Sequence, residues 1–258
     1  MKNLLFIGDV VGKSGCDFFC SKIRKLKKQY NIDITVVNAE NSAHGNGITP
    51  ISANILLNSG ADVLTTGNHA FKRKEALNMF DEKSDCIIRP ANYPEGMAAG
   101  KGICILDMGA YSVAFVNLMG TAFMDALDNP FTKIDEILEK INTPNIFVDF
   151  HAEATSEKKA MGHYLTGRVS GVFGTHTHVQ TADEIILGGH TAYITDAGMT
   201  GVEISCLGTD IKPVLNKFRF HMPTKFTEAV GDCFLCGVYV QFDEKTGKSH
   251  KIERVIMK

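Results

Sequence analysis

The chain has 258 residues and no tryptophan, and no charge of one sign dominates it: 27 Lys and Arg oppose 29 Asp and Glu, for a net charge of −2. A surface dedicated to coating nucleic acid is normally basic, so this balance argues against a stable nucleic-acid complex. It still permits a nucleotide-sized substrate, which needs only local charge or a metal ion. No apolar run approaches the length of a membrane-spanning helix, and the apolar segment 1–7 lacks a signal-peptide cleavage site. We therefore expect a cytoplasmic protein without membrane contacts.

Cysteine is scarce, odd in number at seven, and scattered along the chain, a usage that fits a reducing cytosol. The spacing of Cys233 and Cys236 resembles half of a zinc knuckle. Their segment reads as a strand, however, in which positions i and i+3 face opposite sides, and no second half follows. Buried free thiols are therefore the better interpretation of these residues.

The first third of the chain alternates short apolar runs with amphipathic segments. The predicted strands cover residues 3–7, 32–38 and 61–66, and the predicted helices cover 14–28, a segment starting at Pro50, and 72–80. Such alternation predicts a largely parallel sheet that helices cover on both faces.

The remainder of the chain changes character. Hairpins are predicted from 102–106 with 112–118, and from 233–242 with 250–257. A helix near 133–140 and strands at 145–150, 169–173 and 191–195 complete the pattern. Since no repeat, low-complexity tract or linker interrupts the sequence, we predict a single domain, residues 1–258, that contains two sheets.

Five of the predicted strands end in polar residues that can bind metals. In open α/β sheets, sites gather beyond the carboxyl ends of the strands. Oxygen and imidazole donors without thiolate suit ions such as Fe, Mn or Zn. Eight donors exceed the needs of one ion and indicate two ions, which in phosphoester-cleaving sites lie roughly 3.5–4 Å apart. The eight residues are Asp9, Glu40, Asn41, Asn68, His69, His151, His176 and His178.

Each of these residues also has an ordinary structural explanation. Asp9 could cap the following helix, Asn68 could form a turn, and His69 could begin a helix. Two histidines at i and i+2, such as His176 and His178, are weak evidence by themselves. The metal interpretation therefore depends on their joint occurrence at five strand ends.

Two blocks resemble those of a known superfamily. Gly67-Asn68-His69 and the segment Gly174-Thr175-His176-Thr177-His178 are similar to the GNH and GHxH blocks of calcineurin-like metallophosphoesterases. The YmdB-like subfamily is resembled more closely, over nearly the whole chain, in residues 6–12, 38–45, 89–94, 149–157, 174–181 and 194–201. The resemblance implies an α/β fold, a four-layer sandwich of two packed mixed β-sheets flanked by α-helices.

The chain departs from the wider superfamily in two places. Asp9 lacks the usual Asp-x-His partner, and Glu40-Asn41 stands where most relatives carry a bridging Asp. The YmdB-like subfamily shows both departures, so they sharpen the assignment to it.

The resemblance also implies roles for individual residues. Glu40 would bridge two metal ions, most often iron in this subfamily, with Mn or Zn as alternatives. His69 would be the general acid, a role that suits imidazole because it exchanges protons near neutral pH. The remaining ligands would be Asp9, Asn41 and His178 at the first ion and Asn68, His151 and His176 at the second.

The implied reaction opens 2′,3′-cyclic nucleotides to 3′-nucleotides, by in-line attack of a metal-activated hydroxide on phosphorus. Two alternatives stay open: a phosphomonoesterase or another phosphodiesterase of the same fold, and a regulatory protein that senses phosphate or nucleotide. The expected partner is a small nucleotide substrate, and a homo-oligomer is also open.

Other polar residues have weaker claims. His44, in a Gly-rich loop, could contact phosphate or base, or could simply order the loop. Arg89 and Arg168 could clamp a phosphate or form surface ion pairs. Asp196 is expected to anchor a turn, and Glu157 either starts a helix or orients His151.

Overall fold

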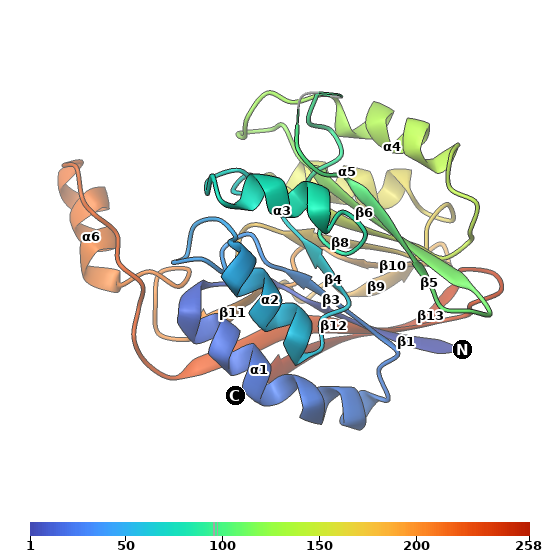
Figure 1. The fold of residues 1–258 in the computed structure, drawn as a ribbon, viewed down its shortest axis with the longest axis horizontal. Coiled ribbons are helices and arrows are strands. Elements are labelled where there is room, and N and C mark those ends of the chain that lie inside the picture. Colours follow the sequence, from blue (N-terminus) through green and yellow to red (C-terminus); the bar gives the residue numbers. More distant parts are fainter. Residues whose placement is uncertain (95, 97) are drawn as a thin grey trace.

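The computed structural model describes residues 1–94, 96 and 98–258. Two β-sheets pack face to face and helices cover the outer side of each, which gives four layers (Figure 1). Both sheets are mixed, because each contains parallel and antiparallel neighbours. The α/β sandwich implied by the resemblance is therefore confirmed.

The first sheet has the order β2-β11-β12-β1-β3-β4, with β13 paired to β12. Its strands are β1 (Lys2–Ile7), β2 (Asp9–Val10), β3 (Ile34–Asn38), β4 (Val63–Thr65), β11 (Met199–Val202), β12 (Cys233–Phe242) and β13 (Ser249–Met257).

The second sheet has the order β5-β6-β7-β8-β10-β9. Its strands are β5 (Ile103–Asp107), β6 (Ser112–Met119), β7 (Ile146–His151), β8 (Gly171–Thr175), β9 (Ile185–Leu187) and β10 (Thr191–Ile194).

Alternation along the strands explains the layers. In β1, Leu4 and Phe6 face the second sheet, where Phe6 meets Phe173 with ring centroids 4.9 Å apart. Leu5 and Ile7 face the opposite side and pack against the helices. Successive side chains of a strand point to opposite faces, so an apolar run without polar interruption fits a strand that is covered on both faces.

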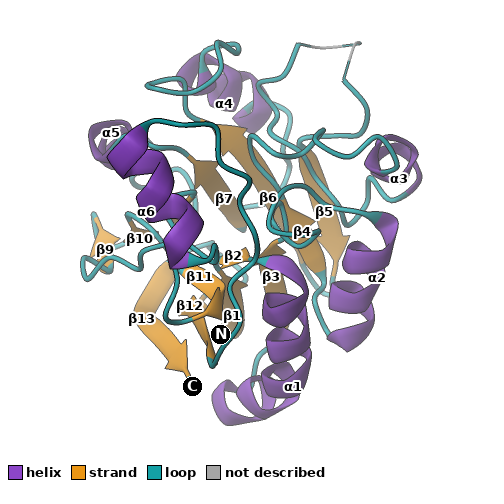
Figure 2. Cartoon of the chain, turned by 90° about the vertical axis from the view of Figure 1, so that its left-hand side faces the viewer, coloured by secondary structure: helices purple, strands orange, loops and turns teal. Residues whose placement is uncertain are grey.

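The helices divide between the two outer faces. The first sheet is covered by α1 (Gly12–Tyr30), α2 (Pro50–Ser59) and α3 (Ala76–Glu82), and the second by α4 (Pro130–Leu138) and α5 (Thr155–Tyr164). A sixth helix, α6 (Ile211–Phe220), stands apart from both sheets, and none of its ten described residues is buried (Figure 2).

The predicted strands and both hairpins are present, with ends shifted by a few residues. Helix α3 begins at Ala76 instead of residue 72, because 67–75 form a series of turns in which Ala70 N donates to Gly67 O and Lys72 N donates to His69 O. The sequence did not predict β2, β9, β11 or α6. All seven cysteines are free, and Cys236 is buried while Cys233 is partly exposed. Among the described helices, none has the length and hydropathy needed to cross a bilayer.

Candidate metal centre

Parallel pairing brings the polar strand ends together. Strands β1, β3 and β4 run parallel in the first sheet, and β6, β7 and β8 run parallel in the second. Their carboxyl ends meet at one edge of the sandwich, which is where α/β proteins place their sites. All eight residues singled out from the sequence lie there, each in contact with at least one other of the eight.

One half of the cluster contains Asp9, Asn41 and His178. Asp9 Oδ1 lies 3.5 Å from His178 Nε2. Asn41 Nδ2 lies 3.4 Å from Asp9 Oδ1 and 3.1 Å from His178 Nε2. A half-turn of the Asn41 amide would present its oxygen to this group, since the two ends of an amide have nearly the same shape.

The other half contains Glu40, Asn68, His151 and His176. His151 Nε2 lies 3.2 Å from Glu40 Oε1, 2.9 Å from Asn68 Oδ1 and 3.0 Å from His176 Nδ1. One donor atom each from Glu40, His151 and His176 fall within 4.8 Å of one another. Such close convergence of oxygen and imidazole nitrogen is the donor set of a transition-metal site.

The two carboxylates are ionised although both are fully buried. Burial alone would raise the pKa of Asp9, but its attraction to His178 and His151 outweighs burial and lowers that pKa. Burial likewise opposes ionisation of Glu40, and the neighbouring His151 and His69 hold its pKa well below the ordinary value. Two buried negative charges at one site need compensating positive charge, which a cation supplies.

The imidazoles respond to the same charges. Burial would lower the pKa of His151, but the attraction of Glu40 raises it to about 9. Burial, together with repulsion from His151, lowers the pKa of His176 to about 4. His176 therefore presents neutral ring nitrogens, the form that binds metals.

The hydrogen bonds of His151 also fit a metal ligand. Thr175 Oγ1 donates its hydrogen to Asp149 Oδ1, at 2.7 Å, so it accepts from His151 Nδ1, at 2.9 Å. With the proton fixed on Nδ1, the Nε2 lone pair of the neutral ring points at Glu40, Asn68 and His176. Metal-bound imidazoles usually have such a partner on the other nitrogen.

His69 lies at the rim of the cluster, with about a quarter (26%) of its side chain exposed. Its backbone N donates to Glu40 Oε2 at 3.0 Å, and its Nδ1 lies 2.7 Å from Asn41 Oδ1. The ring is therefore fixed to two of the candidate ligands while one edge remains accessible.

Glycine precedes the site residues because the two sheets approach closely here. A Cβ atom on Gly67 would lie 2.2 Å from His151 Cδ2 and 2.4 Å from Glu40 Oε2. A Cβ atom on Gly174 would lie 1.7 Å from the Thr195 carbonyl oxygen. The glycines of the GNH-like and GHxH-like blocks are thus required by space.

The turn that carries the histidine pair is strained. His176 has φ of 100° and His178 has φ of 64°, in the region that side chains other than glycine rarely adopt. Asp196 holds this turn, since its Oδ2 accepts from Thr177 N at 3.1 Å and Thr177 Oγ1 at 2.7 Å. The same oxygen pairs with Lys158 of α5 in a buried ion pair of 2.7 Å. The expectation that Asp196 anchors a turn is confirmed.

The weaker candidates lie elsewhere or act otherwise. The side chain of His44 is 82% exposed and pairs with Glu228 at 3.3 Å. Arg168 pairs with Asp135 on the surface, as the ion-pair alternative expected. Arg89 is buried and donates to backbone carbonyls, for example that of Pro90 at 2.8 Å.

Glu157 does not orient His151. It accepts from the backbone nitrogens of Thr121 at 2.9 Å and Ala122 at 3.3 Å, so it holds the loop that follows β6. Thr175 and Asp149 perform the orienting role instead. The sequence signal for them was a carboxylate inside the apolar strand β7, two residues before His151.

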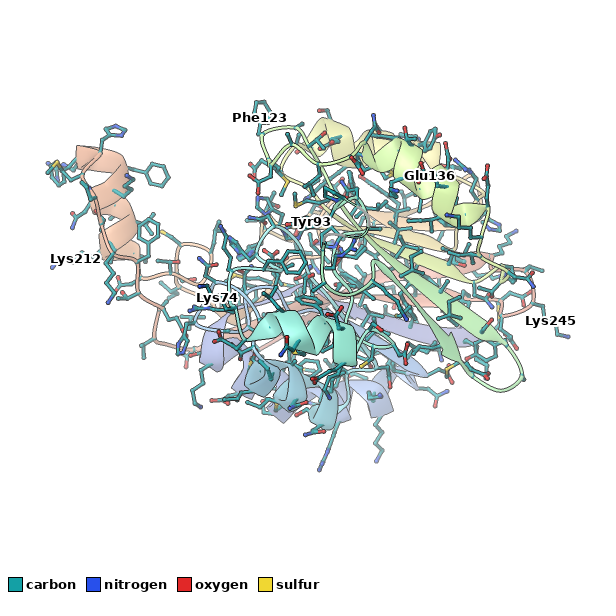
Figure 3. All side chains as sticks on the ribbon, turned by 45° about the horizontal axis from the view of Figure 1, so that its top comes forward. Lys74, Tyr93, Phe123, Glu136, Lys212 and Lys245 are labelled. Carbon is teal, nitrogen blue, oxygen red and sulfur yellow. The ribbon has the colours of Figure 1, made fainter. Side chains whose placement is uncertain are left out.

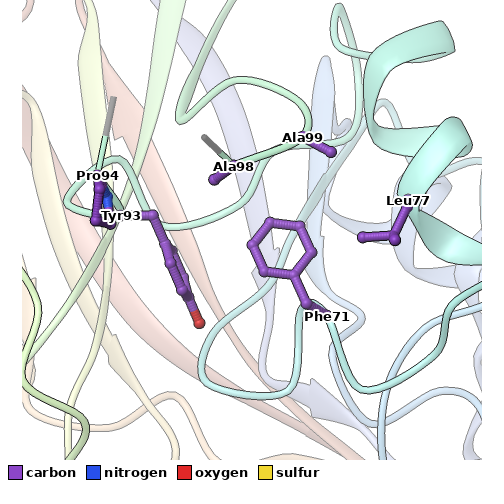
Figure 4. Close-up of a pocket in the computed structure, with 6 residues that line it drawn as sticks. All are labelled: Phe71, Leu77, Tyr93, Pro94, Ala98 and Ala99. Atoms are coloured by element: carbon purple, nitrogen blue, oxygen red, sulfur yellow. The ribbon is translucent and has the colours of Figure 1, made fainter. Parts of the chain in front are cut away.

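An apolar pocket lies beside His69. Its volume is about 280 Å³, and its lining includes Phe71, two residues after His69, and Tyr93. Figure 4 shows these two rings beside each other, with their centroids 5.1 Å apart. Burial is the main cause that raises the pKa of Tyr93, and the charges of Asp125 and Glu40 add to it, which places the phenol within electrostatic range of the cluster.

Comparison with known proteins agrees with this geometry. A 2′,3′-cyclic-nucleotide 2′-phosphodiesterase of Bacillus subtilis (strain 168) is 47% identical over 256 residues, covering 98% of this chain and 96% of the relative. A crystal structure of a novel phosphatase from Mycoplasma pneumoniae superposes with a TM-score of 0.95 at 33% identity, covering 99% of this chain and 93% of that one. A hypothetical protein from Thermus thermophilus gives 0.93 at 38% identity, covering 99% and 98%. A sequence model of YmdB-like proteins matches residues 5–255, and the chain belongs to this family.

Proposed function

We propose that this chain, a hydrolytic phosphoesterase, is a metal-dependent phosphodiesterase that opens 2′,3′-cyclic nucleotides to 3′-nucleotides. The observation that carries the proposal is the convergence of two buried ionised carboxylates, Asp9 and Glu40, with three imidazoles at one sheet edge. The name of the 47% identical Bacillus relative supports this choice of substrate.

The proposed metal ligands are those at the strand ends. Glu40 lies between the two halves of the cluster, because it contacts both Asn41 and His151, and is assigned as the bridging ligand. Bound ions supply Lewis acidity to the phosphoryl oxygens and generate a nucleophile at neutral pH. We assign iron first, with Mn or Zn as alternatives, since oxygen and imidazole donors accept all three.

His69 is the proposed proton donor. In the reaction, water adds to phosphorus, the bond from phosphorus to the 2′ oxygen breaks, and that oxygen takes up a proton. Asn41 Oδ1 lies beside His69 Nδ1, at 2.7 Å, so Nε2 is the nitrogen left to carry the transferred proton. The backbone contact from His69 N to Glu40 keeps the ring at the rim, where a departing oxygen is accessible.

The pocket beside His69 is assigned to the nucleobase. Phe71 and Tyr93 offer apolar aromatic surfaces, and base–aromatic stacking tolerates every base because each has a π-face. The arrangement places a base next to the residue that would protonate the ribose oxygen.

The test compares turnover of 2′,3′-cyclic AMP, 3′,5′-cyclic AMP and para-nitrophenyl phosphate by metal-loaded protein. We expect the 2′,3′-cyclic substrate to be preferred and the product to be the 3′-nucleotide. His69→Ala should lower kcat by roughly 10²–10⁴-fold, the usual contribution of a general acid. His163→Ala, an exposed histidine of α5, is the matched control and should retain activity. Dominant monoester cleavage, or full activity of His69→Ala, would overturn the proposal.

A further inference from the structure

Residues 204–230, here called the arm, carry an unusual amount of exposed apolar surface. Nine large apolar side chains of this segment are at least 38% exposed. They offer on the order of 800 Å², more than the largest apolar patch of a typical monomer and close to one partner's share of a standard interface. The nine are Ile204, Leu207, Ile211, Leu215, Phe218, Phe220, Met222, Phe226 and Val230.

Helix α6, at the centre of the arm, needs a partner surface. It has ten residues, none of them buried, and isolated helices shorter than about 12–15 residues are marginal in water. Ile211, Leu215 and Phe218 follow each other at spacings of four and three, so they share one face. Such a face is normally covered by another element.

The base of the arm is fixed at the candidate metal centre. Asp210 N donates to Thr227 O and Ala229 N donates to Gly208 O, both at 2.9 Å, so the two ends of the arm are clasped together. His178 Nδ1 lies 3.2 Å from the carbonyl oxygen of Leu207. The arm therefore projects from a defined point beside the site.

Charge indicates what the arm can bind. Its four basic residues, Lys212, Lys217, Arg219 and Lys225, exceed its two acidic ones, in a chain whose net charge is −2. Two arms packed on each other would bring these like charges together, so a complementary surface is acidic and apolar.

The loop 121–128 of the same chain has these properties. Phe123 at its tip is 91% exposed, and the segment contains Asp125 and Asp128 but no Lys or Arg. Figure 3 shows Phe123 on the body and Lys212 at the start of the detached helix. The loop follows β6, whose end also reaches the centre, since Gly120 N donates to His151 O at 2.9 Å.

We propose that the arm docks on a second copy of this chain, against its loop 121–128, in a two-fold symmetric dimer. Both complementary surfaces occur on one chain, and a two-fold axis uses each of them twice. The partner's arm then lies beside the metal centre, because arm and loop both start there.

The first test measures mass in solution by sedimentation velocity and light scattering. Wild-type protein should be a dimer at micromolar concentration, and Leu215→Glu with Phe218→Glu should halve the mass while the circular dichroism spectrum is retained. Ile51→Glu is the matched control, because Ile51 of α2 is 74% exposed, as is Phe218, and lies outside the arm. This variant should remain a dimer. A monomeric wild type, or an unchanged mass in the double variant, would overturn the proposal.

A charge exchange tests the contact with the loop. Lys217→Glu with Arg219→Glu should weaken the dimer, as should Asp125→Lys with Asp128→Lys, and the four changes together should restore it. Failure of the fourfold variant to associate would overturn the pairing of arm with loop. These readouts are masses, so they are independent of the proposed catalytic function.

Discussion

Thr175 shows how much one hydroxyl can matter at this site. It relays the charge of Asp149 to His151 Nδ1 and thereby keeps the Nε2 lone pair directed at the cluster. We expect Thr175→Val to weaken metal affinity about 10–100-fold, the usual effect of removing such a partner, measured by competition with a chromophoric chelator.

The control for this prediction is Thr35→Val. Thr35 is also buried in a strand, but its hydroxyl has no hydrogen-bond partner among the described residues. This change should leave metal affinity unaltered. Equal affinities for wild type and Thr175→Val would contradict the assigned role of Thr175.

At the residue scale, the sequence predicted the donors but not what supports them. Asp9, Glu40 and His151 are visible because each ends an apolar run and the parallel topology then places the ends together. Thr175 and Asp149 lie inside strands, and which buried polar groups pair across neighbouring strands depends on register. Register between β7 and β8 is a property of the whole sheet, so a single sequence does not reveal it.

At the scale of elements, helix α5 is tied to the histidine turn by a buried ion pair. Both side chains of the Lys158–Asp196 pair are at most 2% exposed. Lys158→Met would leave Asp196 buried without its counter-charge, and we expect a loss of about 3–5 kcal/mol in the free energy of unfolding, measured in urea.

The neighbouring residue supplies the matched control. Lys159 pairs with Asp183, but these side chains are 45% and 28% exposed. Lys159→Met should therefore cost no more than about 1 kcal/mol. If both variants lost the same stability, the distinction between the buried and the exposed pair would be wrong.

Asp183 also gives a dependence on pH. Burial opposes its ionisation, but Lys159 and the hydroxyls of Thr181 and Thr195 outweigh burial and lower its pKa from 3.8 to about 2. A depressed native pKa stabilises the fold above the ordinary value, and this contribution is lost as the pH falls through the native value. Asp183→Asn should therefore be less stable than wild type at neutral pH, with a gap that narrows between about pH 4 and pH 2. Urea unfolding of both proteins without metal measures this gap, and a gap that widens in acid would contradict the assignment.

Elements were predictable from sequence where they are buried. The strands β1, β3, β7 and β12 were found because they are nearly continuous apolar runs, whereas β2 and β11 are short and read as turns. Helix α6 was missed because Pro213 interrupts its pattern and no neighbouring segment indicates a surface for its apolar face. That face makes sense only if a second molecule covers it.

At the scale of the whole molecule, two sheets that pack through an apolar interface meet at one edge in a group of buried charges. Asp9 and Glu40 repel each other, and this repulsion is among the causes that oppose ionisation of Asp9. A folded protein without a counter-ion keeps this repulsion, whereas the unfolded chain separates the two carboxylates. Metal binding is therefore linked to folding.

Removal of metal should consequently lower the thermal stability of the whole chain. A ligand that binds only the folded state stabilises it by about 2.7 kcal/mol at a concentration 100 times its Kd. We expect chelator-treated protein to melt at lower temperature, and stepwise addition of Mn²⁺ or Fe²⁺ to raise Tm. Glu40→Gln should lose most of this rise because the proposed bridging charge is gone, while His163→Ala should keep it. Equal Tm with and without metal would contradict the linkage, because two buried carboxylates at one edge would then be stable without a cation.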